Sequence, residues 1–141
     1  MKRPVATIVA LLIAIVVLIL LQKKIKNLVT AWRNRRAQKD EQQLLSDLGI
    51  SASHSGMWYQ SLANELKQAV TWTMFSPNCD ETATQKALVK LDNDRDYIEL
   101  ALAFGVVDGW SMEQWIQSCL NASEKNYVNS NWSSKGMTTK I

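Results

Sequence analysis

The sequence predicts an all-α protein: an N-terminal transmembrane helix extended by a long amphipathic helix, followed by a compact bundle of about five short helices. Two observations support this fold class. Residues 5–21 form an uncharged apolar run, and most of the later chain repeats apolar residues at helical spacing without strand-like alternation. The predicted divisions are a transmembrane anchor at 1–22, a basic amphipathic helix at 23–48, a linker at 49–56 and a helical domain at 57–141.

The anchor is predicted from the run VATIVALLIAIVVLILL at residues 5–21, which contains no charge and no glycine. A helix of about 18 residues spans roughly 27 Å, close to the hydrocarbon thickness of a bilayer. Only a helix satisfies the backbone there, because lipid offers it no other partner. Lys2 and Arg3 are also compatible with a cleaved signal peptide, but the run is longer than a typical signal core and no small-x-small cleavage site follows.

Charge is distributed unevenly along the chain. Residues 1–39 hold nine Lys and Arg and no acid, whereas residues 40–141 hold seven Lys and Arg and thirteen acids. Basic residues are concentrated after the apolar run, so the positive-inside rule predicts that the C-terminal domain faces the cytoplasm-derived side. A basic run beside a membrane is expected to hold anionic headgroups rather than nucleic acid. The predicted membrane-interface residues are Lys23, Lys24, Lys26, Trp32, Arg33, Arg35 and Arg36.

Helical spacing continues beyond the anchor. Ile25, Leu28, Val29 and Trp32 recur among basic residues, and leucines resume the pattern before Gly49, which is a plausible helix stop. Residues 4–48 therefore form either one long helix or a span followed by a helix lying on the membrane interface. The absence of Pro and Gly from residues 5–48 favours continuity. The small, polar sequence GISASHSG at 49–56 is typical of a linker.

The domain is expected to contain five helices. Apolar positions at helical spacing predict helices over 57–73, 80–91 and 94–104. Ser111, with Gln114 three residues later, begins a capping box for a fourth helix. A fifth helix is expected to start at Ser123 and to end at Gly136.

The order of these signals resembles the annexin-type repeat, in the single-copy form found in small proteins of Bacteroidetes and their phages. The resemblance covers roughly residues 57–136. It is carried by the helix containing Leu66 and Val70, the turn at 78–81, the segment from Asp96 to Gly105 and the segment at 111–116. It implies a bundle of short helices behind the membrane anchor.

The resemblance also carries expectations for the two cysteines. An annexin calcium site uses a glycine-rich turn and a later carboxylate, but here the turn has no glycine and Cys119 lies near the position of the acid, so calcium binding is not carried over. Cys79 and Cys119 would be neighbours in such a fold. We therefore expect a disulfide that closes a loop of about 40 residues and contributes 3–4 kcal/mol. Two buried free thiols are the alternative.

Catalysis finds little support in the sequence. His54, the single histidine, lies in the predicted linker, where a solvated role is expected, and no zinc, nucleotide or cofactor motif occurs. Glu65 and Glu113 are the best candidates for the acid of a peptidoglycan hydrolase, although surface carboxylates are far more often only solvated. The segment LDNDRD at 91–96 is interpreted as a helix-capping loop, because it lacks the glycine and distal glutamate of a calcium loop.

The expected function is that of a non-enzymatic structural or adaptor protein held in a membrane by a single span. A minor membrane protein of a phage virion, linking the bilayer to a protein shell, is its most concrete form. That setting also reconciles a disulfide with a cytoplasm-derived face, because a virion oxidises after release. The expected partners are the bilayer, capsid or envelope proteins and a second copy of the chain. A membrane-anchored peptidoglycan hydrolase and a phage lysis factor are the alternatives.

Overall fold

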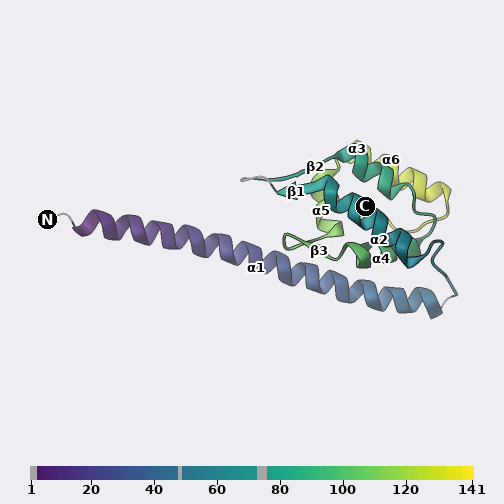
Figure 1. The fold of residues 1–141 in the computed structure, drawn as a ribbon, viewed down its shortest axis with the longest axis horizontal. Coiled ribbons are helices and arrows are strands. Elements are labelled where there is room, and N and C mark those ends of the chain that lie inside the picture. The colour runs from purple at the N-terminus through teal and green to yellow at the C-terminus, as the bar shows by residue number, and fades with distance from the viewer. Residues whose placement is uncertain (1–2, 48, 73–75) are drawn as a thin grey trace.

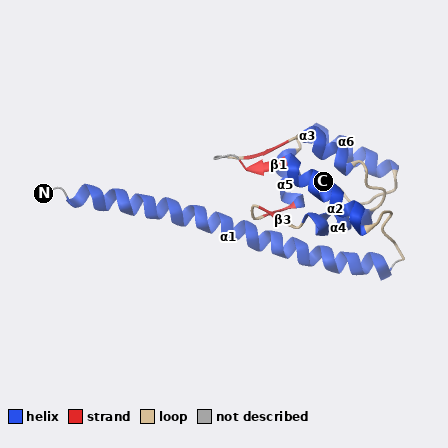
Figure 2. Ribbon diagram, in the orientation of Figure 1, coloured by secondary structure: helices blue, strands red, loops and turns tan. Residues whose placement is uncertain are grey.

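The computed structural model describes the backbone of residues 3–47, 49–72 and 76–141, and the side chains of these residues except 3–20, 23, 24, 27 and 72. A single long helix, α1 (Arg3–Asp47), is followed by five short helices and two small antiparallel ladders (Figures 1 and 2). The short elements gather into one bundle, and the C-terminal part of α1 runs along one side of it. The predominantly helical fold class is therefore confirmed.

Helix α1 is continuous over 45 residues, which confirms the long-helix alternative for its backbone. It ends at Asp47, and Gly49, the predicted helix stop, follows closely. Gly49 has a φ of 75°, a left-handed conformation that glycine adopts without steric cost. The N–H of Ile50 donates to the carbonyl of Leu45 at 2.9 Å, which closes the last turn in a Schellman-type cap.

Among the residues that the structure describes, no helix is long and apolar enough to cross a membrane. The anchor predicted at residues 5–21 belongs to the part of α1 whose side chains lie mostly outside the described set. Membrane anchoring therefore stays a prediction from the sequence.

The first domain helix, α2 (Gly56–Ala69), begins at a Ser55 cap and ends earlier than predicted. Residues 70–73 were expected to continue it, but the chain forms strand β1 (Val70–Trp72), paired with β2 (Pro77–Cys79). Val70, Thr71 and Trp72 are residue types that favour an extended backbone. Pro77 is tolerated because it is the first residue of a strand in a two-stranded ladder. The expectation of a domain without strands was wrong at this point.

The next two helices are each capped by an acidic or amide side chain. Helix α3 (Glu81–Leu88) begins at Asp80, whose carboxylate accepts from the N–H of Ala83, and it ends three residues before the predicted limit. Helix α4 (Asp94–Phe104) has the predicted bounds. Its N-cap is Asn93, so the capping interpretation of residues 91–96 is confirmed.

The last part of the chain combines a tight hairpin with two helices. Strands β3 (Val106–Val107) and β4 (Trp110–Ser111) are joined by Asp108 and Gly109, both at positive φ. Helix α5 (Met112–Cys119) starts with the predicted capping box of Ser111 and Gln114. Helix α6 (Ala122–Ser134) starts at a second capping box, formed by Asn121 and Glu124, so its predicted start at Ser123 was too late.

The core lies between α2, α3, α4, α5 and α6. Its largest fully buried side chains include Trp115, Trp132 and Phe104. The indole N–H of Trp132 donates to the carbonyl of Leu88 at 2.8 Å, so the buried ring leaves no polar atom unpaired. The ring of Tyr97 packs edge-on against Trp132, with 5.5 Å between ring centroids. Helix α1 packs against one side of this core, on α4 and β4.

Candidate interaction surface on the stalk helix

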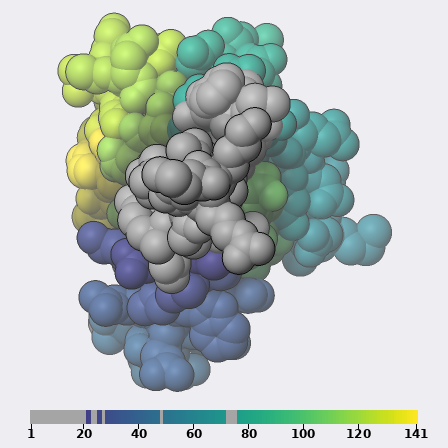
Figure 3. Space-filling view, turned by 90° about the vertical axis from the view of Figure 1, so that its left-hand side faces the viewer, coloured from purple at the N-terminus to yellow at the C-terminus, as the bar shows by residue number. Residues whose placement is uncertain are grey.

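The part of α1 that accompanies the domain, residues 21–47, is called the stalk here. Its inner face consists of Ala31, Gln38 and Leu45, which are buried at 0%, 9% and 9% exposure. They recur every seven residues, a spacing that returns to nearly the same side of a helix. The inner face packs against α4 and β4. Figure 3 views the molecule from the N-terminal end and shows the blue stalk lying below the bundle.

Polar contacts join the stalk to α4. The Nη1 group of Arg95 donates to the carbonyl of Gln42 at 2.7 Å, and its Nε group pairs with Glu99 at 2.7 Å. The side-chain amide of Gln42 donates to the same Glu99 carboxylate at 2.6 Å. Arg95 and Glu99 are only 15% and 23% exposed. Gln42, Arg95 and Glu99 are called the clamp. It could not be predicted from the sequence, because Gln42 lies 53 and 57 residues from its two partners.

Substituting methionine for Arg95 tests the clamp. The variant retains the aliphatic stem but leaves the Gln42 carbonyl and the Glu99 carboxylate without their charged donor. We expect the free energy of unfolding to fall by about 1.5–3 kcal/mol and amide exchange to rise along the stalk.

The matched control is Lys90→Met, which removes an ion pair with Glu65 whose side chains are 46% and 56% exposed. That change should cost below about 1 kcal/mol. Equal effects of the two variants on stability and on stalk exchange would mean that the clamp does not hold the stalk.

The apolar side chains of the stalk lie mostly outside the core. Ile25, Val29 and Trp32 are 59%, 53% and 71% exposed. These three side chains therefore contribute little to the core of the domain. Of the leucines near the end of the helix, Leu44 is 58% exposed whereas Leu45 is buried, so the pattern predicted there is divided between solvent and core.

A basic groove lies on the exposed part of the stalk. Trp32, Arg35, Arg36 and Lys39, spaced at i, i+3, i+4 and i+7, line a hollow of about 370 Å³. Among the described residues, no carboxylate lies within 4.0 Å of these three cations. The groove therefore presents uncompensated positive charge beside an exposed indole, a combination suited to an anionic partner.

The structure describes the side chains of only some of the other residues predicted at the membrane interface. Lys26 and Arg33 are exposed on the stalk. The side chains of Lys23 and Lys24 lie outside the described residues. Exposure to solvent does not show that these residues contact a membrane, so their assignment to the membrane interface stays a prediction.

The two cysteines are neighbours, as the resemblance led us to expect. The structure places Cys79, at the end of β2, and Cys119, at the end of α5, as a disulfide with 5.8 Å between their Cα atoms. The bond joins the β1–β2 ladder to the last part of the bundle. Thr84 lies beside it, with its hydroxyl 3.6 Å from the Cys119 sulfur.

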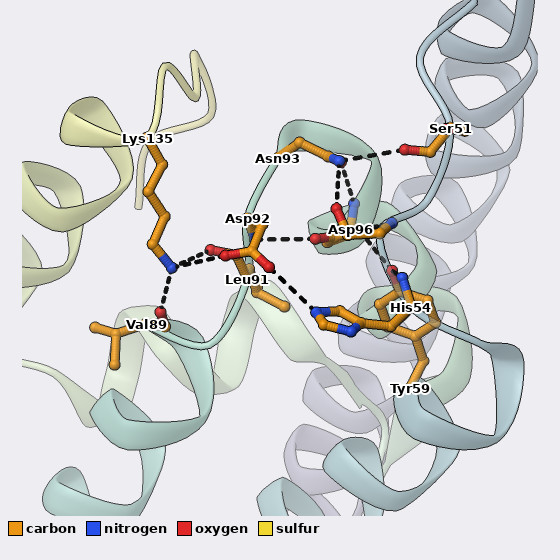
Figure 4. A network of polar contacts seen from close by, with 10 residues as sticks. Ser51, His54, Tyr59, Val89, Leu91, Asp92, Asn93, Asp96 and Lys135 are labelled. Carbon is orange, nitrogen blue, oxygen red and sulfur yellow. Dashed lines mark hydrogen bonds and ion pairs between the residues drawn. The ribbon is translucent and has the colours of Figure 1, made fainter.

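A second cluster joins the predicted linker to α4 (Figure 4). Asp96 is fully buried, and its carboxylate accepts from the N–H of Ser53 at 2.8 Å, the hydroxyl of Tyr59 at 2.5 Å and the N–H of Asp92 at 2.9 Å. The imidazole Nε2 of His54 lies 3.3 Å from the Asp92 carboxylate. The expectation of a solvated His54 was wrong, because its side chain is only 29% exposed and stacks on Trp58.

Lys135 and Asn93 extend this network of polar contacts. Lys135 Nζ lies 3.1 Å from the Asp92 carboxylate and also donates to the carbonyls of Val89 and Leu91. Asn93 donates to the Ser51 carbonyl at 3.2 Å. These bonds fasten residues 51–54 to the start of α4, so the segment predicted as a free linker is a packed connection.

Burial by itself would raise the pKa of Asp96, but the hydrogen bonds from Tyr59, Ser53 and Asp92 outweigh it and lower that pKa below its ordinary value of 3.8. Burial, followed by the bond to Asp96, raises the pKa of Tyr59. Asp96 is therefore an ionised acceptor and Tyr59 a neutral donor at neutral pH.

The same cluster is the place where a metal ion is geometrically conceivable. His54, Asp92 and Asp96 offer ligand atoms within 4.8 Å of one another. However, both Asp96 oxygens already accept hydrogen bonds, and Lys135 brings a positive charge to Asp92. The donor set is thus used by the protein itself, and the cluster is a structural network.

The acids considered for peptidoglycan hydrolysis lie on the surface. Glu65 is exposed and pairs with Lys90, whereas Glu113 is exposed and accepts from Asn34 of the stalk at 3.3 Å. The structure does not bring the two carboxylates together with His54 in one site.

Comparison of the chain with family models, with curated proteins and with solved structures finds no significant match. The functional argument is therefore built from the stalk and its basic groove.

Proposed function

We propose that the protein is a single-pass membrane-anchored structural adaptor in which α1 is both the span and the stalk. The observation that carries the proposal is the continuity of α1 from Arg3 to Asp47. The apolar sequence at 5–21 and the inner face that holds the domain belong to the same helix. A continuous helix would hold the domain at a fixed distance from the membrane.

The helix geometry refines the predicted interface. Trp32 follows Leu21 by a rise of about 16 Å, whereas the headgroup layer of one leaflet is only about 5–8 Å thick. Even a tilt of about 40° would leave Trp32 beyond that layer. Within this proposal, Lys23, Lys24 and Lys26 contact headgroups, and the basic groove stands above the bilayer where it meets protein.

The basic flank after the apolar run supports a domain on the cytoplasm-derived face. The most concrete setting is a virion membrane, with the domain between the bilayer and a protein shell. We infer that residues 57–136 are an annexin-type repeat without its calcium site. The order of five short helices and the Cys79–Cys119 pair support this inference. The proposal assigns no catalytic role to the domain.

The anchor is tested by placing charge inside the apolar run. The variant Leu12→Arg/Ile15→Arg is expected to lose membrane association, because each arginine costs about 2.5–3.5 kcal/mol at the centre of a span. Flotation of the full chain with phosphatidylcholine vesicles after alkaline washing measures the change.

The matched control is Leu44→Arg, the same type of change at a leucine that is 58% exposed on the stalk. The control should float like the wild type. Flotation of the double-arginine variant at the wild-type level would contradict the proposed anchor. Clearing of cell-wall substrate in a zymogram that disappears in Glu65→Gln or Glu113→Gln would instead establish the hydrolase alternative.

A further inference from the structure

The two flanks of the stalk carry opposite charge. Successive residues of a helix turn by about 100°, so positions can be placed relative to the inner face. Arg35 and Lys39 fall on one side of the inner face, together with the rest of the basic groove. Glu41 and Asn34 fall on the other side, where Asn34 donates to Glu113 of α5 at 3.3 Å.

Glu41 and Glu113 form the acidic flank. Both side chains are exposed. Glu41 follows Asn34 by seven residues, so it lies on nearly the same side of the stalk as Asn34, which binds Glu113. A hollow of about 470 Å³ beside Glu113 is lined also by Asn34, Trp110, Gln114, Gln117 and Ser118.

The two flanks lie at matching heights along the stalk. The basic groove covers positions 32–39 of the stalk. On the acidic flank, Glu41 is itself a stalk residue, and Glu113 lies level with position 34 because it accepts a hydrogen bond from Asn34. Copies anchored in one membrane with the same orientation share a common height. The groove of one copy would therefore stand level with the acidic flank of its neighbour, whereas within one copy the stalk separates the two surfaces.

We propose that anchored copies associate side by side, with the basic groove of one copy receiving Glu41 and Glu113 of the next. This inference rests on the proposed membrane anchor. The occupant of the groove is a second copy of the chain, because the complementary charge is present on the chain at the required height. The contact joins two different surfaces, so it produces rows or rings rather than closed pairs. Such rows would suit a protein that lines a bilayer beneath a shell.

The test uses two variants of the full chain that each lack one surface. The groove variant is Arg35→Gln/Arg36→Gln, and the flank variant is Glu41→Gln/Glu113→Gln. Arg33→Gln/Lys86→Gln removes the same charge as the groove variant from two exposed positions that belong to neither surface. Asp40→Asn is the acidic control. Each protein is examined in detergent micelles by sedimentation velocity and in phosphatidylcholine vesicles by zero-length carbodiimide cross-linking.

The wild type and both controls are expected to form a series of oligomers that shortens as salt is raised. Each surface variant alone should remain a single copy. An equimolar mixture of the two variants should form pairs and stop there, because the intact flank of one fits the intact groove of the other and no free surfaces remain.

Self-association of the groove variant at the wild-type level would overturn the proposal. An equimolar mixture of the two variants that forms no pairs would also overturn it. Cross-linking that occurs only when phosphatidylglycerol is added would show that the groove takes anionic lipid and would also overturn it. Flotation of the same samples keeps the tests separate. Chains that float but never associate contradict this inference alone, whereas a wild type that does not float contradicts the proposed anchor.

Discussion

Replacing Asp96 by alanine is expected to lower the free energy of unfolding by about 3–5 kcal/mol. The buried carboxylate accepts from the N–H groups of Ser53 and Asp92 and from the hydroxyl of Tyr59. Removing it leaves the buried hydroxyl of Tyr59 and two partly buried N–H groups without this acceptor, and an unsatisfied buried donor costs about 1–3 kcal/mol. Chemical denaturation of the full chain in mild detergent measures the loss.

The control is Asp40→Ala, which removes the carboxylate of an exposed stalk residue. It should change stability by no more than about 0.5 kcal/mol. The Asp96 variant should also increase amide exchange at residues 51–55, because the network fastens this segment to α4. A loss below about 1 kcal/mol, or unchanged exchange there, would contradict the structural role of Asp96.

The lowered pKa of Asp96 gives this prediction a pH dependence. A carboxyl group whose folded pKa is below its unfolded value contributes stability above the unfolded pKa and loses it as the pH falls through the folded pKa. The ordinary value is 3.8, so the contribution should be constant near neutral pH and should decrease progressively as the pH falls below about 4. The Asp96→Asn variant should lack this part of the acid dependence. Parallel stability curves from pH 7 to pH 2 for the two proteins would contradict the assignment.

Removing the Cys79–Cys119 disulfide is expected to lower the free energy of unfolding by about 4 kcal/mol. The bond joins positions 40 residues apart, and the chain-entropy model gives about this value for such a loop. The double variant Cys79→Ser/Cys119→Ser should therefore unfold roughly 15 °C below the wild type, as measured by the loss of helical circular dichroism.

Reduction of the wild type supplies the matched experiment. A phosphine reductant should lower the unfolding temperature of the wild type toward that of the double variant, and it should not affect the double variant. Alkylation of the non-reduced, unfolded wild type should label neither cysteine. Two labelled cysteines, or a wild type whose unfolding temperature does not respond to reduction, would contradict the bridge.

Local signals in the sequence were sufficient for several element boundaries. Gly49 ends α1, Ser111 and Gln114 start α5, and residues 94–104 form α4 as expected. These features depend on side chains that bond to backbone groups within a few residues or on one residue's own backbone preference. Such interactions are present whatever the rest of the chain does, so they can be predicted without knowing the fold.

The strand β1 shows where local reasoning was insufficient. Val70 continues the apolar spacing of α2, which predicted a helix to residue 73. Pairing with β2 instead draws residues 70–72 into an extended ladder. Helical spacing and an extended strand both place Val70 toward the core, so the pattern could not distinguish them. The outcome depended on a partner strand five residues further along the chain.

The sequence by itself indicated the helical class, favoured the continuity of α1, and predicted the caps of α4 and α5 and, through the annexin resemblance, the cysteine pair. Only the tertiary structure decided that the domain packs along the stalk and that Gln38 and Gln42 of the stalk face it. Gln42 meets Arg95, and Asp96 meets Ser53 and Tyr59, across 37 to 53 residues of sequence. A polar side chain can be stabilised by solvent or by a distant partner, and only packing decides which of the two it has. For the same reason, the opposite charges on the two flanks of the stalk became visible only once the domain was in place.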